Sequence, residues 1–422
     1  MASLSQFAKL HAERLVYRAA GLPVALSALW IAVSGADPGD AFPFDLTFAS
    51  QFWHPQGASD FLELIIATAA LPVALPASII WFTARNGPEI RRRSGKSLTS
   101  QIRDQLRLYA SAGVLPPWYY VFSLHDDSCS TRARTFLQRF ETKPFIFPRL
   151  KTRGGSPLND KAEFAAYCHA KGIPCVETLM LIDGAVPEFS LPDCDLFVKR
   201  NKGRGGRGAE RWDRVASDSF EAPDGERLSG SGLAQRLAAK SRESALVLQP
   251  RLVAHAGLNE LTTGALPTVR VVTCLNESEK PELIGAVFRM AIGGNVTVDN
   301  LHAGGIAAAV DLESGRLSRA TNLGSDARLG WLSHHPDTRA TIEGRTLPLW
   351  NKVKELALTA HCLFDDRVVI GWDIAMLDEG PILIEGNGNP DMDIIQRFMA
   401  TGLRGQRFGE LLDHHLQLRD IR

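Results

Sequence analysis

The segment Val368–Ile384, with the sequence VVIGWDIAMLDEGPILI, predicts a β-hairpin near the carboxyl end of the chain. Two apolar, β-branched stretches flank the turn residues Asp378–Gly380, an arrangement typical of antiparallel strands joined by a short turn. Folding the segment about this turn places Asp373 opposite Glu385, and the period of two brings Asn387 onto the same face. Like charges that face each other destabilise a sheet unless a cation lies between them.

These three side chains are a candidate metal site. Two carboxylates and an amide oxygen are hard ligands, of the kind that Mg²⁺ takes together with nucleotide phosphates. The alternative is a solvated hairpin on which the acids are incidental. It is disfavoured because Asp373 and Glu385 interrupt strands that are otherwise apolar and expected to be buried. We therefore predict that Asp373, Glu385 and Asn387 bind Mg²⁺, with Mn²⁺ as an alternative ion.

Length and composition limit the classes of protein that need to be considered. At 422 residues the chain is long enough for two or three domains. It carries 47 Lys and Arg against 47 Asp and Glu, so no overall charge attracts a nucleic acid, and we expect no nucleic-acid partner. Six scattered cysteines include no close CxxC pair, which argues against a structural zinc site or a disulfide framework and indicates a reducing compartment.

The first hundred residues contain two long uncharged runs, Ala19–Ala36 and Leu64–Ala84. Each is near the length that a helix needs to cross about 30 Å of hydrocarbon. Basic residues precede the first run and follow the second, whereas the linker Asp37–Asp60 carries no Lys or Arg, so both ends are expected on the inner side. We predict a transmembrane hairpin in the cell membrane with the rest of the chain in the cytoplasm. The alternatives are two buried helices of a soluble domain, or attachment to one membrane face.

A second candidate site lies in the segment Leu196–Ala209, LFVKRNKGRGGRGA. An apolar strand ends at Lys199, and a loop follows that is rich in basic residues and in glycines, among them Gly203, Gly205 and Gly206. Glycines let backbone N–H groups approach phosphate oxygens, and the cations neutralise their charge. Taken alone, the loop is equally a flexible hairpin without a ligand. Together with the acidic residues downstream it indicates a nucleotide clamp.

Other strand-like segments contain polar residues that a nucleotide could bind. The apolar strand Leu246–Leu252 could lead into a hinge whose backbone hydrogen-bonds an adenine edge, although a plain core strand is an equal alternative. Arg270 and Arg289 lie in or at the edge of apolar stretches. A buried arginine is costly unless it meets an anion, so both are candidates for holding phosphate or carboxylate. Ion pairs within the core are the alternative for each.

Taken in order, these segments resemble the ATP-grasp superfamily, and most of all its sugar-transfer-associated branch, which is related to α-L-glutamate ligases. The resemblance spans roughly 118–399. The residues that carry it are Asp160-Lys161 with Gly172–Pro174, Lys199 with its loop, Gln249, Arg270, Arg289, Asp299-Asn300 with Gly304-Gly305, and Asp373, Glu385 and Asn387.

The resemblance implies an α+β fold, in which two α+β domains clamp ATP between antiparallel sheets. Its expected parts are a membrane helical hairpin (1–95), a lead-in region (96–190), a small subdomain with the glycine-rich loop (191–255) and a large subdomain with the Mg²⁺ site (256–422).

The resemblance also implies roles for individual residues. Lys161 and Lys199 would contact the phosphates of ATP, and Gln249 would meet the adenine. Arg270 and Arg289, the catalytic candidates, would face the γ-phosphate or the carboxylate of the acceptor. The chain departs from the pattern at position 250, where a proline replaces a common second polar hinge residue.

The implied reaction is that of a ligase, in which ATP activates a carboxylate as an acylphosphate and an amine or similar nucleophile then displaces phosphate. This branch is associated with cell-surface polysaccharide biosynthesis, so we expect a small-molecule or lipid-linked sugar acceptor. One alternative is phosphotransfer to a hydroxyl or a histidine. Another is a nucleotide-binding scaffold without turnover, and the complete set of acidic ligands argues against it.

Overall fold

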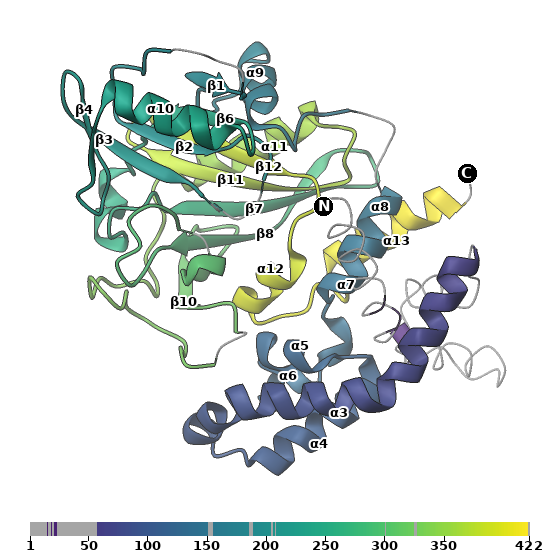
Figure 1. Cartoon of the computed structure of the whole chain (residues 1–422). Coiled ribbons are helices and arrows are strands. Elements are labelled where there is room, and N and C mark those ends of the chain that lie inside the picture. The colour runs from purple at the N-terminus through teal and green to yellow at the C-terminus, as the bar shows by residue number, and fades with distance from the viewer. Residues whose placement is uncertain are drawn as a thin grey trace. The chain divides into compact units, whose positions relative to one another are not determined.

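The computed structural model describes residues 15, 18, 21–22, 57–150, 155–184, 189–203, 206, 208–299, 301–324 and 327–420. Packing divides the chain into two compact units, whose elements are labelled in Figure 1. The first unit consists of Met1–Lys151, Leu323–Gly330 and Asp391–Arg422, and the second of Thr152–Asn322 and Trp331–Pro390. The division differs from the predicted domain boundaries, because the last 32 or so residues pack with the lead-in region rather than with the predicted large subdomain.

The described part of the first unit is helical. Its elements are α3 (Ala58–Ser94), α4 (Leu98–Ala112), α5 (Pro116–Val121), α6 (Asp127–Ser130), η1 (Ala133–Thr135), α7 (Arg139–Glu141), the π-helical turn η2 (Thr142–Ile146), α8 (Phe147–Leu150), α12 (Met392–Met399) and α13 (Arg407–Asp420).

Helix α3 contains the second of the two predicted membrane runs. It is continuous for 37 residues despite three internal prolines, and its most apolar 18-residue window has a mean hydropathy of 2.1 with 11% of the window buried. Large apolar side chains such as Phe61, Val73 and Trp81 are exposed on it. By length and composition α3 can therefore cross a membrane. The first predicted run, Ala19–Ala36, lies outside the described residues except for Gly21 and Leu22, so the predicted hairpin stays a prediction.

Helix α4 is amphipathic and buries the side chains of Gln101, Gln105, Leu108 and Tyr109. The Ser97 side chain caps its first turn by accepting a hydrogen bond from the backbone N–H of Ser100 at 3.1 Å. The helix ends at Gly113, whose φ of 63° is left-handed. Pro116 begins α5, because proline suits the first helical turn.

The second unit contains two six-stranded antiparallel sheets. The first has the order β1-β6-β2-β3-β4-β5. Its strands are β1 (Met180–Ile182), β2 (Leu196–Arg200), β3 (Glu210–Ala216), β4 (Ser219–Glu221), β5 (Arg227–Ser229) and β6 (Leu246–Pro250). Helix α10 (Gly230–Ser241) packs on it, and Leu233 and Leu237 join Val198, Trp212 and Leu248 in the core (Figure 1).

The second sheet has the order β10-β9-β8-β7-β11-β12. Its strands are β7 (Thr268–Leu275), β8 (Pro281–Met290), β9 (Ile306–Val310), β10 (Leu317–Thr321), β11 (Val369–Leu377) and β12 (Gly380–Asn387). Helix α11 (Trp350–Leu363) packs on four of these strands, and α9 (Lys161–Ala170) packs on β12. Short 3₁₀ turns, η3 (Ala256–Leu261) and η4 (Leu301–Ala303), lie in the connections. These two antiparallel sheets with their helices confirm the predicted α+β class.

The predicted β-hairpin forms, with the predicted pairing of Asp373 and Glu385. Strands β11 and β12 pair antiparallel, Asp373 lies opposite Glu385, and Gly371 lies opposite Asn387. The turn consists of Asp378 and Glu379, because Leu377 and Gly380 are the last pair. A register shift follows directly after Asp373. Between the turn and Ile374 the pairs are one residue out from the predicted register, and this shift restores the predicted pairing from Asp373 onward.

Candidate functional site

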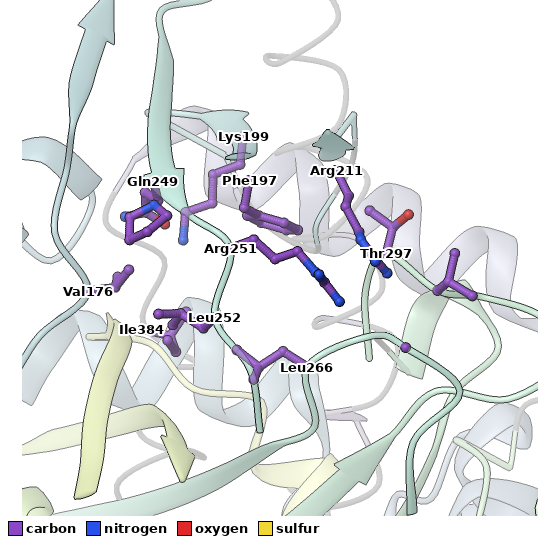
Figure 2. A pocket seen from close by; sticks show the side chains of 13 residues that line it. Val176, Phe197, Lys199, Arg211, Gln249, Arg251, Leu252, Leu266, Thr297 and Ile384 are labelled. Carbon is purple, nitrogen blue, oxygen red and sulfur yellow. The ribbon is translucent and has the colours of Figure 1, made fainter. Parts of the chain in front are cut away.

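A narrow pocket of about 60 Å³ in the second unit is lined by residues of both sheets (Figure 2). Apolar side chains from β2, β12 and the connecting segments form most of its wall. The lining residues are Val176, Phe197, Lys199, Arg211, Gln249, Pro250, Arg251, Leu252, Gly264, Leu266, Val296, Thr297 and Ile384. An apolar slot with a few polar groups is typical of a site for a flat heterocycle such as adenine.

Lys199 provides the positive charge at one end of this pocket. It is the fourth residue of β2, it is 9% exposed, and no described residue accepts a hydrogen bond from its amine. Burial lowers the pKa of Lys199 to about 8, while the carboxylate of Glu385 opposes that shift. A buried ammonium without a hydrogen-bond acceptor is costly, so the position favours an anionic ligand.

Gln249, the predicted adenine contact, lies beside Lys199, and its role stays a prediction. It is 3% exposed on β6 and pairs with Phe197 of β2, and Figure 2 shows its side chain next to that of Lys199. The hinge that follows contains Pro250, which has no N–H to donate, and Arg251, whose N–H is bound to the carbonyl of Asp195 at 2.9 Å. The chain therefore offers fewer backbone donors at this hinge than a non-proline residue would allow.

A second cavity of about 220 Å³ lies at the ends of β2 and β12. It is lined mostly by polar residues and glycines and brings together Lys161, Gly203, Glu385 and Asn387, whereas Lys199 lines the smaller pocket and Asp373 lines neither. The lining residues are Leu158, Asn159, Lys161, Lys202, Gly203, Glu385, Asn387, Gly388 and Asn389. The two cavities are electrostatically linked, because the pKa of Lys199 responds to both Lys161 and Glu385.

A hydrogen-bond network at the start of α9 positions Lys161. Asp160 caps the helix by accepting from the N–H of Glu163 at 3.0 Å. Asn201, which follows β2, donates to Asp160 at 2.9 Å and accepts from the N–H of Ala162 at 3.0 Å. The Lys161 amine donates to the Gly203 carbonyl at 2.9 Å. The amine is thereby held between the glycine loop and Glu385, from which it lies 4.0 Å away.

Asp373 is held by two arginines. Arg270, directly opposite it on β7, makes a bidentate contact with Nε–Oδ1 and Nη2–Oδ2 distances of 2.7 and 2.6 Å. Arg289 of β8 adds a contact of 3.2 Å to Oδ2. Burial acts to raise the pKa of Asp373, but the two guanidinium groups outweigh it and hold the pKa at about 2. Asp373 is therefore a carboxylate at any ordinary pH.

The sequence left open whether Arg270 and Arg289 hold a ligand anion or form ion pairs within the core. Both meet an anion, and that anion belongs to the chain itself. Arg289 also lies 3.4 Å from Asp299, which accepts hydrogen bonds from the N–H and hydroxyl of Thr268. Burial raises the pKa of Asp299, although Arg289 opposes that effect. The ion-pair alternative thus describes their contacts here, and a catalytic role for either arginine stays a prediction.

The donor set fits a hard divalent ion in part. Glu385 accepts no hydrogen bond from any described residue, and the buried Nδ2 of Asn387 makes none. Asp373 already accepts three contacts, so about one of its four lone-pair sites is left for a metal. The two arginines neutralise the charge of Asp373, so this carboxylate does not need a metal ion for that purpose. Among the described residues no three His, Cys, Asp or Glu side chains gather into a metal site, so Mg²⁺ would depend on Asn387 as well.

The glycine-rich loop is described only in part. Gly203 lines the larger cavity. Gly206 has a left-handed φ of 63°, and a Cβ at this position would lie 3.2 Å from Val298, so the loop meets the segment that lines the smaller pocket. The third predicted glycine, Gly205, lies outside the described residues.

Sequence reasoning missed several polar residues that the fold brings to this site. Asn201 fixes the start of α9, and Asn389 lines the larger cavity. The sequence holds a signal for Asn389, since Glu385, Asn387 and Asn389 alternate with glycines in the run EGNGNP. Arg367 lies against Gly388, and nothing in its local sequence distinguishes it from a surface arginine.

The two antiparallel sheets enclose an apolar slot with a buried lysine, next to a cavity lined by acidic and basic residues. This arrangement is a clamp-like nucleotide-binding fold of the ATP-grasp class. A family model described as sugar-transfer associated ATP-grasp matches residues 141–409, more than half of the chain. The chain therefore belongs to the sugar-transfer associated ATP-grasp family, as its motifs suggested.

Solved structures with partial similarity include ligases. D-alanine–D-alanine ligase from Bacillus anthracis is 13% identical, with 68% of this chain and 79% of that chain covered and a TM-score of 0.36. D-alanyl-alanine synthetase A from Vibrio cholerae is 13% identical, with 63% and 66% covered and a TM-score of 0.37. L-amino acid ligase from Bacillus licheniformis is 10% identical, with 62% and 48% covered and a TM-score of 0.35. The family assignment rests on the family model and not on these overlaps. A comparison with curated proteins found no significant match.

Proposed function

We propose that the chain is an ATP-dependent ligase that activates a carboxylate as an acylphosphate and joins it to an amine or a similar nucleophile. One observation carries this proposal. Lys199 from the first sheet and Glu385 and Asp373 from the second lie within electrostatic reach of one another, beside an apolar slot. Opposite charges from two sheets around a pocket suit a triphosphate bound between a cationic side and a metal-binding side.

The two cavities would divide the nucleotide between them. The adenine would enter the apolar slot beside Gln249, and the phosphates would extend past Lys199 toward Lys161 and the glycine loop. Both lysines would neutralise phosphate charge, and Lys199 would do so from a nearly dry position where the interaction is strong. The Gly203 carbonyl, which now accepts from Lys161, would have to release it for a direct contact with phosphate.

Glu385 and Asn387, with the remaining lone pair of Asp373, would hold Mg²⁺ at the phosphate end. When bound, the ion would neutralise the phosphates and orient the terminal one. The chain contributes positioning and charge rather than covalent catalysis. The acid oxygen attacks the γ-phosphorus and ADP leaves with the bridging oxygen. The nucleophile then attacks the acyl carbon, the bond to phosphate breaks, and the proton of the nucleophile passes to solvent.

We also propose that α3 attaches the protein to a membrane and that the acceptor belongs to cell-surface polysaccharide biosynthesis. The exposed apolar side chains of α3 and the three arginines of its last turn support attachment at an inner, anionic surface. Helix α4 packs beside Thr83 of α3 and carries the exposed Arg103 and Arg107. These charged residues limit how α3 can insert into a membrane. The description of the family supports the polysaccharide role.

ATP binding and product analysis test the proposed reaction. Purified full-length protein with Mg²⁺ and ATP should release ADP only when an acid and an amine are both present, with formation of an amide. Glu385→Gln should abolish turnover, whereas Glu379→Gln, on the exposed turn of the same hairpin, should leave it unchanged. Formation of a phosphorylated acceptor would mean that the protein is a phosphotransferase and not a ligase. If the protein binds ATP but turns over none of the acids and amines, it is a nucleotide-binding scaffold. If it does not bind ATP, the proposed nucleotide site is refuted.

A further inference from the structure

The glycine-rich loop that follows β2 has its carbonyl groups bound and its N–H groups free, at the glycines that the structure describes. The carbonyl oxygen of Gly203 accepts from the amine of Lys161 at 2.9 Å, that of Gly206 from the N–H of Ala209 at 3.1 Å, and that of Gly208 from the amine of Lys240 at 3.0 Å. The N–H groups of the same three glycines donate to no described residue. A loop of this polarity suits an anion, because free N–H groups attract phosphate oxygens and free carbonyl groups repel them.

Lys240 holds the end of the loop that returns to β3. It lies in the last turn of α10, and its amine bonds both the Gly208 carbonyl and the carboxylate of Glu210, the first residue of β3. Gly208 has a left-handed φ of 73°, and a Cβ at this position would lie 3.8 Å from the amine. The lysine therefore fixes the direction of the carbonyl at the closing end of the loop.

Glu210 in turn fixes Lys240. Its second oxygen accepts from the indole N–H of Trp212 at 2.9 Å and lies 3.6 Å from Arg236 Nε. Burial acts to raise the pKa of Glu210, but the hydrogen bonds from Lys240 and Trp212 outweigh it and lower the pKa. Glu210 therefore stays ionised and neutralises the ammonium of Lys240. The contribution of Lys240 to the loop is then mainly geometric, in contrast to that of Lys199, which has no such partner among the described residues.

We propose that Lys240 is a positioning residue for nucleotide binding, which turns the Gly208 carbonyl toward α10 and leaves the N–H groups of the loop to the phosphates. The inference rests on the proposed function, in which the phosphates of ATP extend to this loop. Lys240 acts through the backbone of the loop and does not itself contact the nucleotide. Without the lysine the Gly208 carbonyl loses its partner, and the peptide is free to turn an oxygen toward the phosphates.

Lys240→Gln tests the inference, and Arg236→Gln is the matched control. Both residues are cations on α10 that contact Glu210, and of the two Lys240 alone donates to a described residue of the loop. The ligands are ATP with Mg²⁺, measured by titration calorimetry, and adenosine, which lacks phosphates, measured by ligand-observed NMR. In the full-length protein Lys240→Gln should raise the Kd of ATP about tenfold, the equivalent of one hydrogen bond, and leave the Kd of adenosine within about twofold. Arg236→Gln should leave both within about twofold.

Three results would overturn the inference: an unchanged Kd of ATP in Lys240→Gln, an equal loss of adenosine binding in that variant, or an equal loss of ATP binding in Arg236→Gln. Hydrogen exchange without nucleotide gives a second measurement. The N–H of Ala209, which is bonded to Gly206, should exchange faster in Lys240→Gln than in Arg236→Gln, and equal rates would also contradict the role of Lys240. If the wild type does not bind ATP, the proposed function is refuted, and the exchange rates decide separately whether Lys240 holds the loop.

Discussion

Replacement of Asp373 by asparagine separates the structural role of this residue from its predicted metal role. The substitution keeps the shape of the side chain but removes the charge that two buried arginines share. The pKa of Asp373 is lowered from an ordinary 3.8 to about 2, a difference that corresponds to about 2.5 kcal/mol. Breaking a buried ion pair by removing one partner typically costs about 3–5 kcal/mol. We therefore expect Asp373→Asn to lower the free energy of unfolding by about 2–4 kcal/mol.

Glu385→Gln provides the contrast within the same pair of strands. Glu385 has a side chain that is 23% exposed, and its ion pair with Lys161 is as long as 4.0 Å. Such a contact is worth less than about 1 kcal/mol, so this variant should keep its stability and lose only Mg²⁺-ATP binding. Glu379→Gln, on the exposed turn, should change neither quantity and serves as the control.

Hydrogen exchange followed by mass spectrometry measures the effect where it arises. Amides of β7 and β11 should open more readily in Asp373→Asn, and those of the first sheet much less. The folded pKa lies below the unfolded value, so this stabilisation is complete above about pH 4 and is lost as the pH falls toward 2. The asparagine variant should lack that acid-dependent loss. Unchanged protection in Asp373→Asn, or an equal loss in Glu385→Gln, would refute the argument.

Three further predictions address other parts of the molecule. Because burial lowers the pKa of Lys199 to about 8, the affinity for ATP should fall as the pH rises through 8, and Lys199→Arg should remove this dependence in a titration of Kd against pH. Gly386→Ala would place a Cβ 2.5 Å from Leu158 and 3.0 Å from Trp372, so it should cost about 1–3 kcal/mol in thermal or urea unfolding, whereas Gly155→Ala should cost little. After an alkaline carbonate wash, the full-length protein should remain in the membrane pellet through α3, and recovery in the supernatant would contradict an integral attachment.

The predictions that the structure confirms depend on short-range patterns. The hairpin of β11 and β12 was expected from two apolar stretches around a turn, and its Asp373–Glu385 pair is as predicted. The pairs beside the two-residue turn are one residue out from that prediction, and the shift after Asp373 restores the predicted pairing. Lys199, Gly203 and the acidic pair could be proposed as site residues because each stands out in its own segment, and their roles stay predictions.

Contacts between distant segments were out of reach of the same reasoning. Arg270 lies 103 positions before Asp373, and only the placement of β7 next to β11 makes the two a pair. From the sequence, we expected a metal ion to neutralise the facing carboxylates of Asp373 and Glu385. In the fold, two guanidinium groups already neutralise Asp373. Arg367 was missed for a related reason, since its burial depends on the packing around Gly388 and not on its neighbours along the chain.

Taken by itself, the sequence determined which residues are chemically suited to bind a phosphate and a metal, and that two of them face each other across a hairpin. Those facts depend on residue type and on the period of a strand, which are local. Only the tertiary structure decided which charges meet which, because the pairing of β7 with β11 and the approach of β2 to β12 join segments about a hundred or more residues apart. Burial and long-range pairing, which set the pKa of Lys199 and of Asp373, exist only once both sheets are assembled.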